Sequence, residues 1–294
     1  MALDNCSRAS PGMDRLSPED RVPSRLKRPI VLLIFQLLAF WPVWRWFASR
    51  LNDGSDDSWG LVALITALGF LVFRRPQLKS QRASLLLPSL FTLIYLGSFH
   101  LLSPLPRAVI ATFALAATLS IYFDNAPWQP GLCGLLLLAL PLMASLQFYL
   151  GFPLRLLIAT MAAPILQLGG LPVLPEGACL NWDGRLLLID APCSGIKMLW
   201  TGLYLTFTLA CYYRLNLKRT ALAIVIALPT VILANLLRAL ALFYVESGIL
   251  FGRGLPAWTH EGIGVAFFLL SATAVAWAIH RLSERNLCAA RLSS

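Results

Sequence analysis

Charged residues are scarce in this sequence of 294 residues. They make up only 13% of it, whereas hydrophobic residues make up 58%. Soluble globular domains carry about 25% charged residues, and a chain so poor in charge cannot cover its apolar surface in water. The composition therefore excludes an ordinary soluble domain and predicts an all-α polytopic membrane protein. The net charge of +10 does not indicate nucleic acid, because no soluble basic domain is long enough to bind it.

Metal-binding motifs are also absent. The six cysteines are scattered, and none stands in a CxxC pair or at a metal-ligand spacing from one of the three histidines. We therefore expect no metal site, and the sequence contains no cofactor motif. A disulfide framework is not expected either, since the cysteines fall on both predicted sides of the membrane.

Apolar runs near the length of a membrane span recur along the chain. A helix needs about 20 apolar residues to cross the hydrocarbon core. About eight transmembrane helices are predicted, at 30–47, 59–73, 84–102, 105–123, 131–150, 193–213, 220–246 and 259–281.

The basic residues set the predicted orientation of these spans. If both termini are cytoplasmic, sixteen of the 24 basic residues lie on the cytoplasmic side, as the positive-inside rule requires. Residues 1–29 then form a disordered basic cytoplasmic tail, 30–281 a single transmembrane domain and 282–294 a short cytoplasmic tail. The predicted location is the cell (inner or plasma) membrane.

The longest connection, 152–192, lies on the extracytoplasmic side in this topology. Its first part, 154–168, is apolar and is expected to lie in the interface or to re-enter the membrane. Farther along, Asp183-Gly184 is a turn signal next to a short apolar stretch. A small extracytoplasmic β-hairpin is therefore predicted just before the sixth span.

The first polar interruption stands at the start of the sixth span, as Pro192-Cys193-Ser194-Gly195 followed by Lys197. A helix N-terminus presents free N–H groups and partial positive charge, which favour a thiolate at Cys193. Lys197 follows at i+4 on the same helical face and adds positive charge. The alternative interpretation is that Cys193 is a small buried hydrophobic residue and that Lys197 snorkels to the interface.

The second interruption is Arg238 in the seventh span. It stands 18 residues after Thr220, so a rise of about 1.5 Å per residue puts it about 27 Å away, near the outer face of a core about 30 Å thick. Asn235 lies on the same side of this helix. A charge in lipid is costly and usually functional; the alternatives are that Arg238 reaches the interface or pairs with Glu246.

The third interruption is His260, at the outer start of the eighth span. Alone it would be interpreted as a cap or an interface residue, but it shares its predicted depth with Cys193 and Arg238. A thiolate can attack a carbonyl, a guanidinium can stabilise the oxyanion and an imidazole can transfer the protons. Asp190 and Glu261 either orient His260 or solvate the mouth of the site.

The three interruptions together resemble the exosortase/archaeosortase family, over about residues 190–268. The resemblance implies that Cys193, Arg238 and His260 are catalytic, with Asn235, Ser194, Gly195 and Lys197 in support. The motifs that carry it, in chain order, are Pro192-Cys193-Ser194-Gly195-Ile196, Asn235-Leu236-Leu237-Arg238, and His260 followed by Gly262 or Gly264.

Membership would imply a cysteine peptidase or transpeptidase that works through a Cys193 acyl-enzyme. Its partners would be proteins with a C-terminal sorting signal, which consists of a short Pro-Glu-Pro-like motif, a transmembrane helix and a basic tail. Cleavage would take place on the outer face of the membrane. The resemblance leaves open the exact motif, the choice between hydrolysis and transfer, and the oligomeric state.

Other functions remain as alternatives. A transporter would use Arg238 in a substrate path and would carry polar residues at mid-depth in several spans, whereas the polar residues here are expected to gather in one outer layer. A lipid-linked acyltransferase would use the same nucleophile, and a non-catalytic assembly factor would not. A disulfide between Cys179 and Cys193, both predicted outside, would block the thiol.

Overall fold

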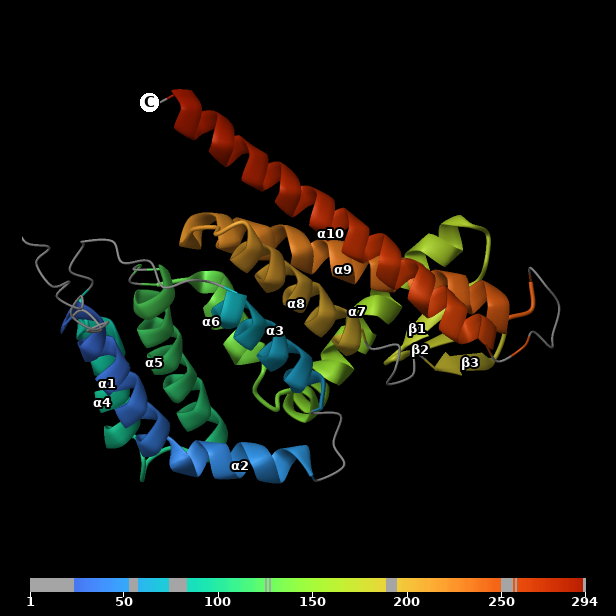
Figure 1. The fold of residues 1–294 in the computed structure, drawn as a ribbon. Helices are drawn as coiled ribbons and strands as arrows, with labels where there is room; N and C mark the ends of the chain where they lie inside the picture. Colours follow the sequence, from blue (N-terminus) through green and yellow to red (C-terminus); the bar gives the residue numbers. More distant parts are fainter. Residues whose placement is uncertain are drawn as a thin grey trace, which may run out of the picture.

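The computed structural model describes residues 24–52, 58–73, 84–124, 126, 128–188, 195–249, 256 and 258–292. Within these ranges the chain forms ten helices and one small three-stranded sheet (Figure 1). The helices are α1 (Ser24–Ala39), α2 (Trp41–Leu51), α3 (Trp59–Phe73), α4 (Leu86–Gly97), α5 (Pro104–Asp124), α6 (Pro130–Leu138), α7 (Met143–Leu168), α8 (Ile196–Tyr212), α9 (Leu217–Glu246) and α10 (Trp258–Leu292). The strands are β1 (Val173–Glu176), β2 (Cys179–Trp182) and β3 (Arg185–Leu188).

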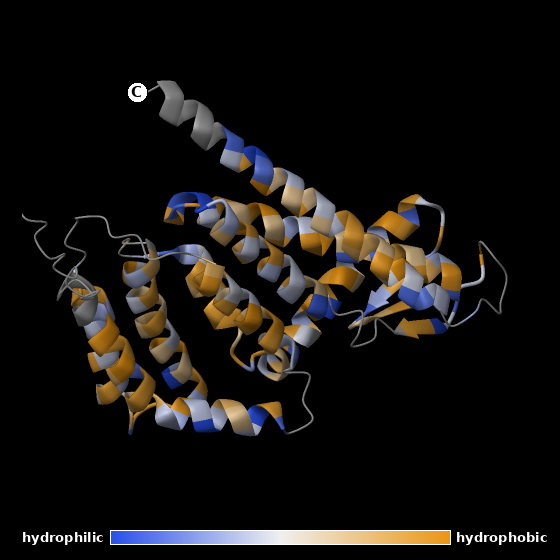
Figure 2. Ribbon diagram, viewed as in Figure 1, coloured by the Kyte–Doolittle hydropathy of each residue, from blue (hydrophilic) through white to orange (hydrophobic). Residues whose placement is uncertain are grey.

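Many of the helices expose large apolar side chains. Phe73 is 89% exposed and Leu38 is 73% exposed, and Figure 2 shows hydrophobic residues along most of the helix lengths. Apolar surface of this extent is suited to lipid and not to water. Among the described residues, α5, α7, α9 and α10 are long and apolar enough to cross a membrane, and α1 with α2 makes a fifth span if counted as one. The prediction of about eight spans is thus not confirmed and stays a prediction.

The predicted span 30–47 is wrong as one continuous helix. The chain bends by 56° between α1 and α2, at Phe40, just before Trp41 and Pro42. A proline inside a helix removes one i→i−4 hydrogen bond and clashes with the preceding turn, so the ring of Pro42 is accommodated in the first turn of a new helix. In Figure 1, α2 accordingly lies at a large angle to α1.

The predicted span 131–150 is also wrong, because it is divided between α6 and α7. Pro141 lies in the break between them and cannot donate an N–H to continue α6. Residues 152–168, predicted to belong to a long connection, instead continue α7 up to Leu168. The connection that remains before α8 therefore consists mainly of the small sheet.

The small sheet has three antiparallel strands in the order β1-β2-β3, where the sequence predicted only a two-stranded hairpin. Asp183 and Gly184 connect β2 to β3 with φ values of 54° and 76°, the left-handed conformation that a tight hairpin turn requires. The first hairpin joins β1 to β2, and Val173 pairs there with Trp182.

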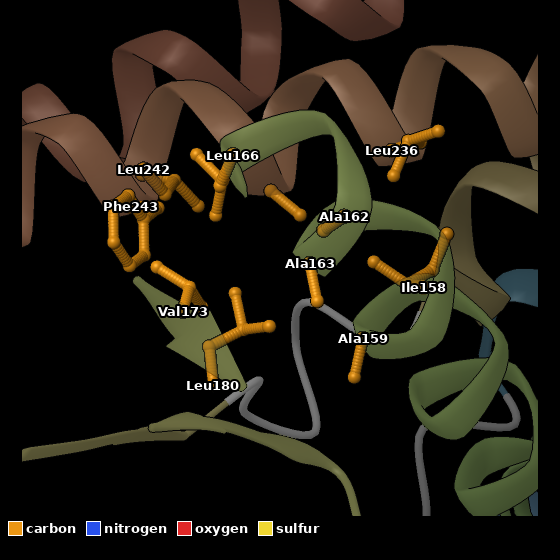
Figure 3. Packing of buried hydrophobic residues seen from close by; sticks show 11 residues of the cluster. Ile158, Ala159, Ala162, Ala163, Leu166, Val173, Leu180, Leu236, Leu242 and Phe243 are labelled. Atoms are coloured by element: carbon orange, nitrogen blue, oxygen red, sulfur yellow. The ribbon is translucent and has the colours of Figure 1, made fainter. Parts of the chain in front are cut away.

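The sheet is attached to the helices by an apolar cluster (Figure 3). Val173 and Leu180 point from the sheet towards α7 and α9, where they meet Leu166 and Phe243. The ring of Trp182 adds an edge contact to Phe243 at 6.0 Å. This packing fixes the sheet beside the C-terminal half of α9.

A buried polar cluster joins α1, α4 and α5. Gln36 is fully buried; its Nε2 donates to Thr92 Oγ1 at 2.9 Å, and its Oε1 accepts from Thr118 Oγ1 at 2.8 Å. The sequence analysis missed this cluster, because it expected polar residues in one outer layer only. The hydrogen bonds join three helices at buried positions, so a structural role accounts for the cluster.

Glycines at helix contacts allow the close packing of this bundle. A methyl group on Gly131 of α6 would lie 2.6 Å from the backbone nitrogen of Cys211 in α8, whereas a methyl group on Gly69 of α3 would meet nothing within 4 Å. We expect Gly131→Ala to destabilise the protein by about 1–3 kcal/mol through overpacking. Gly69→Ala should be neutral or stabilising, since alanine favours helices. Thermal denaturation in detergent measures both, and equal stability of the two variants would contradict the prediction.

Candidate active site

Three helices, α8, α9 and α10, bring the described members of the predicted site to one end of the bundle, namely Gly195, Lys197, Asn235, Arg238 and His260. Gly202 of α8 lies against Val231 of α9, and Gly195 lies against Asn235, so α8 and α9 are antiparallel. The start of α10 likewise lies beside the end of α9, because His260 contacts Glu246. The N-termini of α8 and α10 therefore meet the C-terminal half of α9.

Gly195 places the start of α8 directly on α9. Its φ of +81° is left-handed, a conformation that glycine adopts without steric cost. A methyl group on Gly195 would lie 2.6 Å from Nδ2 of Asn235, so the absence of a side chain allows this approach. Asn235 is 3% exposed and is held between α8 and α9.

Arg238 lies one turn farther along α9 and packs against α10. Its side chain is half-buried, and a methyl group on Gly264 would lie 3.2 Å from Nη2 and 3.3 Å from Cζ. The guanidinium therefore covers the backbone at Gly264. Of the two glycines named in the sequence motif, Gly264 lies against Arg238, whereas a methyl group on Gly262 would meet only Trp258, at 3.8 Å.

His260 lies one helical turn before Gly264 on α10. Its Nδ1 is 3.5 Å from Oε1 of Glu246, with both side chains about two-fifths exposed. The sequence analysis considered Glu246 only as a partner for Arg238 and considered Asp190 and Glu261 for His260. Glu261 is exposed, whereas Glu246 provides the carboxylate beside the imidazole.

The remaining site predictions have mixed outcomes. Cys193 and Ser194, like Asp190, lie outside the described residues. Lys197 is exposed in the first turn of α8. Cys179 lies in β2 as a free thiol, so it forms no disulfide with Cys193 in this structure. No group of three or more metal-ligating side chains occurs in the described part of the chain.

The opposite end of the same three helices is basic. The side chain of Asn216 caps α9 there by accepting the N–H of Arg219 at 3.1 Å. Tyr213 contacts His280 at 3.1 Å, and Arg281 lies 3.5 Å from Glu284. The bundle is thus polarised, with Asn235, Arg238 and His260 far from this basic end.

The long apolar helices and the polar cluster at one end define a helical membrane protein with a candidate active site near a helix terminus. The family model described as transmembrane exosortase matches residues 44–277. No curated protein and no solved structure gives a significant match. The match covers most of the chain, which therefore belongs to the transmembrane exosortase family, a family of cysteine peptidases and transpeptidases.

The contact between Gly195 and Asn235 can be tested through stability. Gly195 and Gly170 have nearly the same φ, +81° and +82°, but a methyl group on Gly170 would meet nothing within 4 Å. Both alanine variants bear a left-handed backbone cost of about 1–2 kcal/mol. We expect Gly195→Ala to lower the free energy of unfolding by about 1–3 kcal/mol more, through overpacking against Asn235, and thermal denaturation measures the difference. Equal losses in the two variants would show that Asn235 does not constrain the start of α8.

Proposed function

We propose that this protein is a membrane-embedded cysteine peptidase or transpeptidase that cleaves membrane-anchored proteins at a C-terminal sorting signal. Cys193 is the nucleophile, Arg238 stabilises the oxyanion and His260 transfers protons. Family membership supports the class of activity, and the arrangement of α8, α9 and α10 supports the roles of the residues.

One observation carries the proposal: α9 holds the start of α8 and the start of α10 at adjacent positions. Asn235 contacts Gly195, and Arg238, three residues later, contacts Gly264, which is one turn from His260. Cys193 stands two positions before Gly195 in the sequence, and Gly195 is the described residue that contacts the helix carrying the guanidinium.

The proposed reaction has two acyl-transfer steps. The Cys193 thiolate attacks the carbonyl carbon of the scissile peptide, and the guanidinium of Arg238 stabilises the negative charge on the carbonyl oxygen. The C–N bond breaks, His260 protonates the leaving amine and a thioester remains. Water or an amine then attacks the thioester carbonyl and gives its proton to His260, and the C–S bond breaks to release the Cys193 thiolate, which restores the starting pair of thiolate and protonated imidazole. Glu246 acts as a positioning residue, since its carboxylate lies beside Nδ1 of the imidazole.

We place the site on the extracytoplasmic side of the cell membrane. The other end of α8, α9 and α10 carries Arg214, Lys218, Arg219 and Arg281, and basic residues favour the cytoplasmic side. A substrate anchored by its own helix would diffuse in the membrane plane and present its scissile peptide just outside the lipid.

The nucleophile is tested with Cys193→Ala. We expect no processing of a membrane-anchored reporter that ends in a sorting signal, with unchanged amounts of enzyme in the membrane, because no thioester can form without the thiol. Immunoblotting of the reporter measures the processed fraction. Cys179→Ala is the matched control and should process the reporter normally. Processing by Cys193→Ala would remove Cys193 from the mechanism.

The position of Arg238 is tested with two glycine variants of α10. Gly264→Ala forces the guanidinium to move by a few tenths of an ångström, whereas the nearest atom to a methyl group on Gly262 is Cε3 of Trp258 at 3.8 Å. We expect Gly264→Ala to process the reporter on the order of tenfold more slowly, about 1.4 kcal/mol of transition-state stabilisation, and Gly262→Ala to be unaffected. Arg238→Lys should be inactive, since lysine lacks the forked set of N–H donors that a guanidinium provides. Equal rates for the two glycine variants would contradict the proposal that the position of Arg238 against Gly264 matters for the reaction.

A further inference from the structure

A cavity of about 220 Å³ lies between α3, α8, α9 and α10, outside the polar site. Val62 of α3, Leu205 of α8, and Phe268 and Ala272 of α10 contribute to its walls, which are almost entirely apolar. Among the described helices, α3 and α10 both pack against α8, and the cavity lies over the face of α8 between them. No residue with a role in the proposed reaction lines it.

The cavity is aligned with the proposed site. Trp59 of α3 contacts Trp200 of α8, and farther along both helices Thr66 hydrogen-bonds Tyr204 at 2.8 Å. The helices α3 and α8 are therefore parallel and begin at the same end. The cavity starts along α8 at Trp200, five residues after Gly195, so its outer end lies about 7.5 Å along the helix axis from Gly195.

We propose that this cavity is the docking groove for the transmembrane helix of the substrate. This inference rests on the proposed function, which requires a substrate that is itself anchored by one helix. A helix lying alongside α8 in the groove brings its outer end to the start of α8. The peptide at the outer end of such a helix then lies near the start of α8, where Gly195 contacts Asn235.

The size and lining of the groove suit the surface of a helix. A pocket that encloses a whole small ligand has about 300–1,000 Å³, so this cavity accepts only the side chains of a partner that remains mostly outside. Thr201, Gly202, Ser271 and Ala272 form part of its wall. Small and hydroxylated residues of this kind are typical of contacts between helices in membranes, because they allow backbones to approach closely.

The charge at the outer end of the groove suits the same partner. Lys197 is exposed and stands one helical turn before Thr201 on the same face of α8, so it adds positive charge beside the outer end of the groove. An acidic residue in the motif next to the substrate helix would then lie on the same side as this lysine. The cation and the apolar wall are thus in the order that an acidic motif followed by an apolar helix requires.

Photo-crosslinking in the Cys193→Ala enzyme tests the groove without requiring turnover. A benzophenone side chain at position 268 lines the groove, whereas one at position 269 is on a neighbouring face of α10, where Leu269 is 56% exposed. We expect position 268 to crosslink the helix of the anchored reporter at least fivefold more than position 269. Equal labelling of the reporter from both positions, or labelling of lipid alone from position 268, would overturn the proposal.

A pair of bulky substitutions tests the same groove in the active enzyme. Ala272→Phe fills the cavity, whereas Ala274→Phe adds the same ring at an exposed position of α10. We expect at least a fivefold slower processing of the anchored reporter by Ala272→Phe alone, with unchanged thermal denaturation of both variants. Equal rates would overturn the docking groove while leaving the proposed function intact. The proposed function fails separately, if Cys193→Ala still cleaves the reporter.

Discussion

The candidate site depends on one constraint, which is that the guanidinium of Arg238 must fit between the helices α9 and α10. A charge in a span is costly unless protein groups surround it, and Arg238 is half-buried against Gly264 of α10. A methyl group at position 264 would lie 3.2 Å from Nη2 of Arg238, so even alanine there would displace the guanidinium by a few tenths of an ångström. This contact constrains the packing of α10 on α9, and His260 lies one turn away on α10 beside Glu246.

The rest of the C-terminal half supports α9 in this position. Asn235 holds the start of α8, and the small sheet packs through Val173 and Leu180 on the same half of α9. Contacts on α8, α10 and the sheet thus converge on one helix, which explains how a polar site forms without a soluble domain to support it. The Gln36 cluster connects the N-terminal helices α1, α4 and α5 in a comparable way, through hydrogen bonds instead of glycine contacts.

Sequence reasoning located α9, α10 and the family, because long apolar runs and an arginine within one of them depend on local composition. It did not predict which prolines end a helix and which lie within one. Helices break next to Pro42 and Pro141, yet α7 continues through Pro153 and Pro164. The local effect of each ring is the same, but in membranes neighbouring groups can satisfy the freed backbone. Tertiary surroundings therefore decide whether a proline ends a helix, and a sequence pattern does not contain them.

The contacts between side chains within the site could not be predicted from the sequence either, because they depend on how α9 and α10 are rotated about their axes. Glu246 and His260 are separated by 14 positions, and only the packed bundle brings the carboxylate to 3.5 Å from the imidazole. The sequence could identify the residue types for acyl transfer but not the geometry between them. That geometry follows from α9, which carries Asn235 towards α8 and both Arg238 and Glu246 towards α10. A single helix thus holds the start of α8 at Asn235 and the start of α10 at Arg238 and Glu246, although these segments come from three parts of the chain.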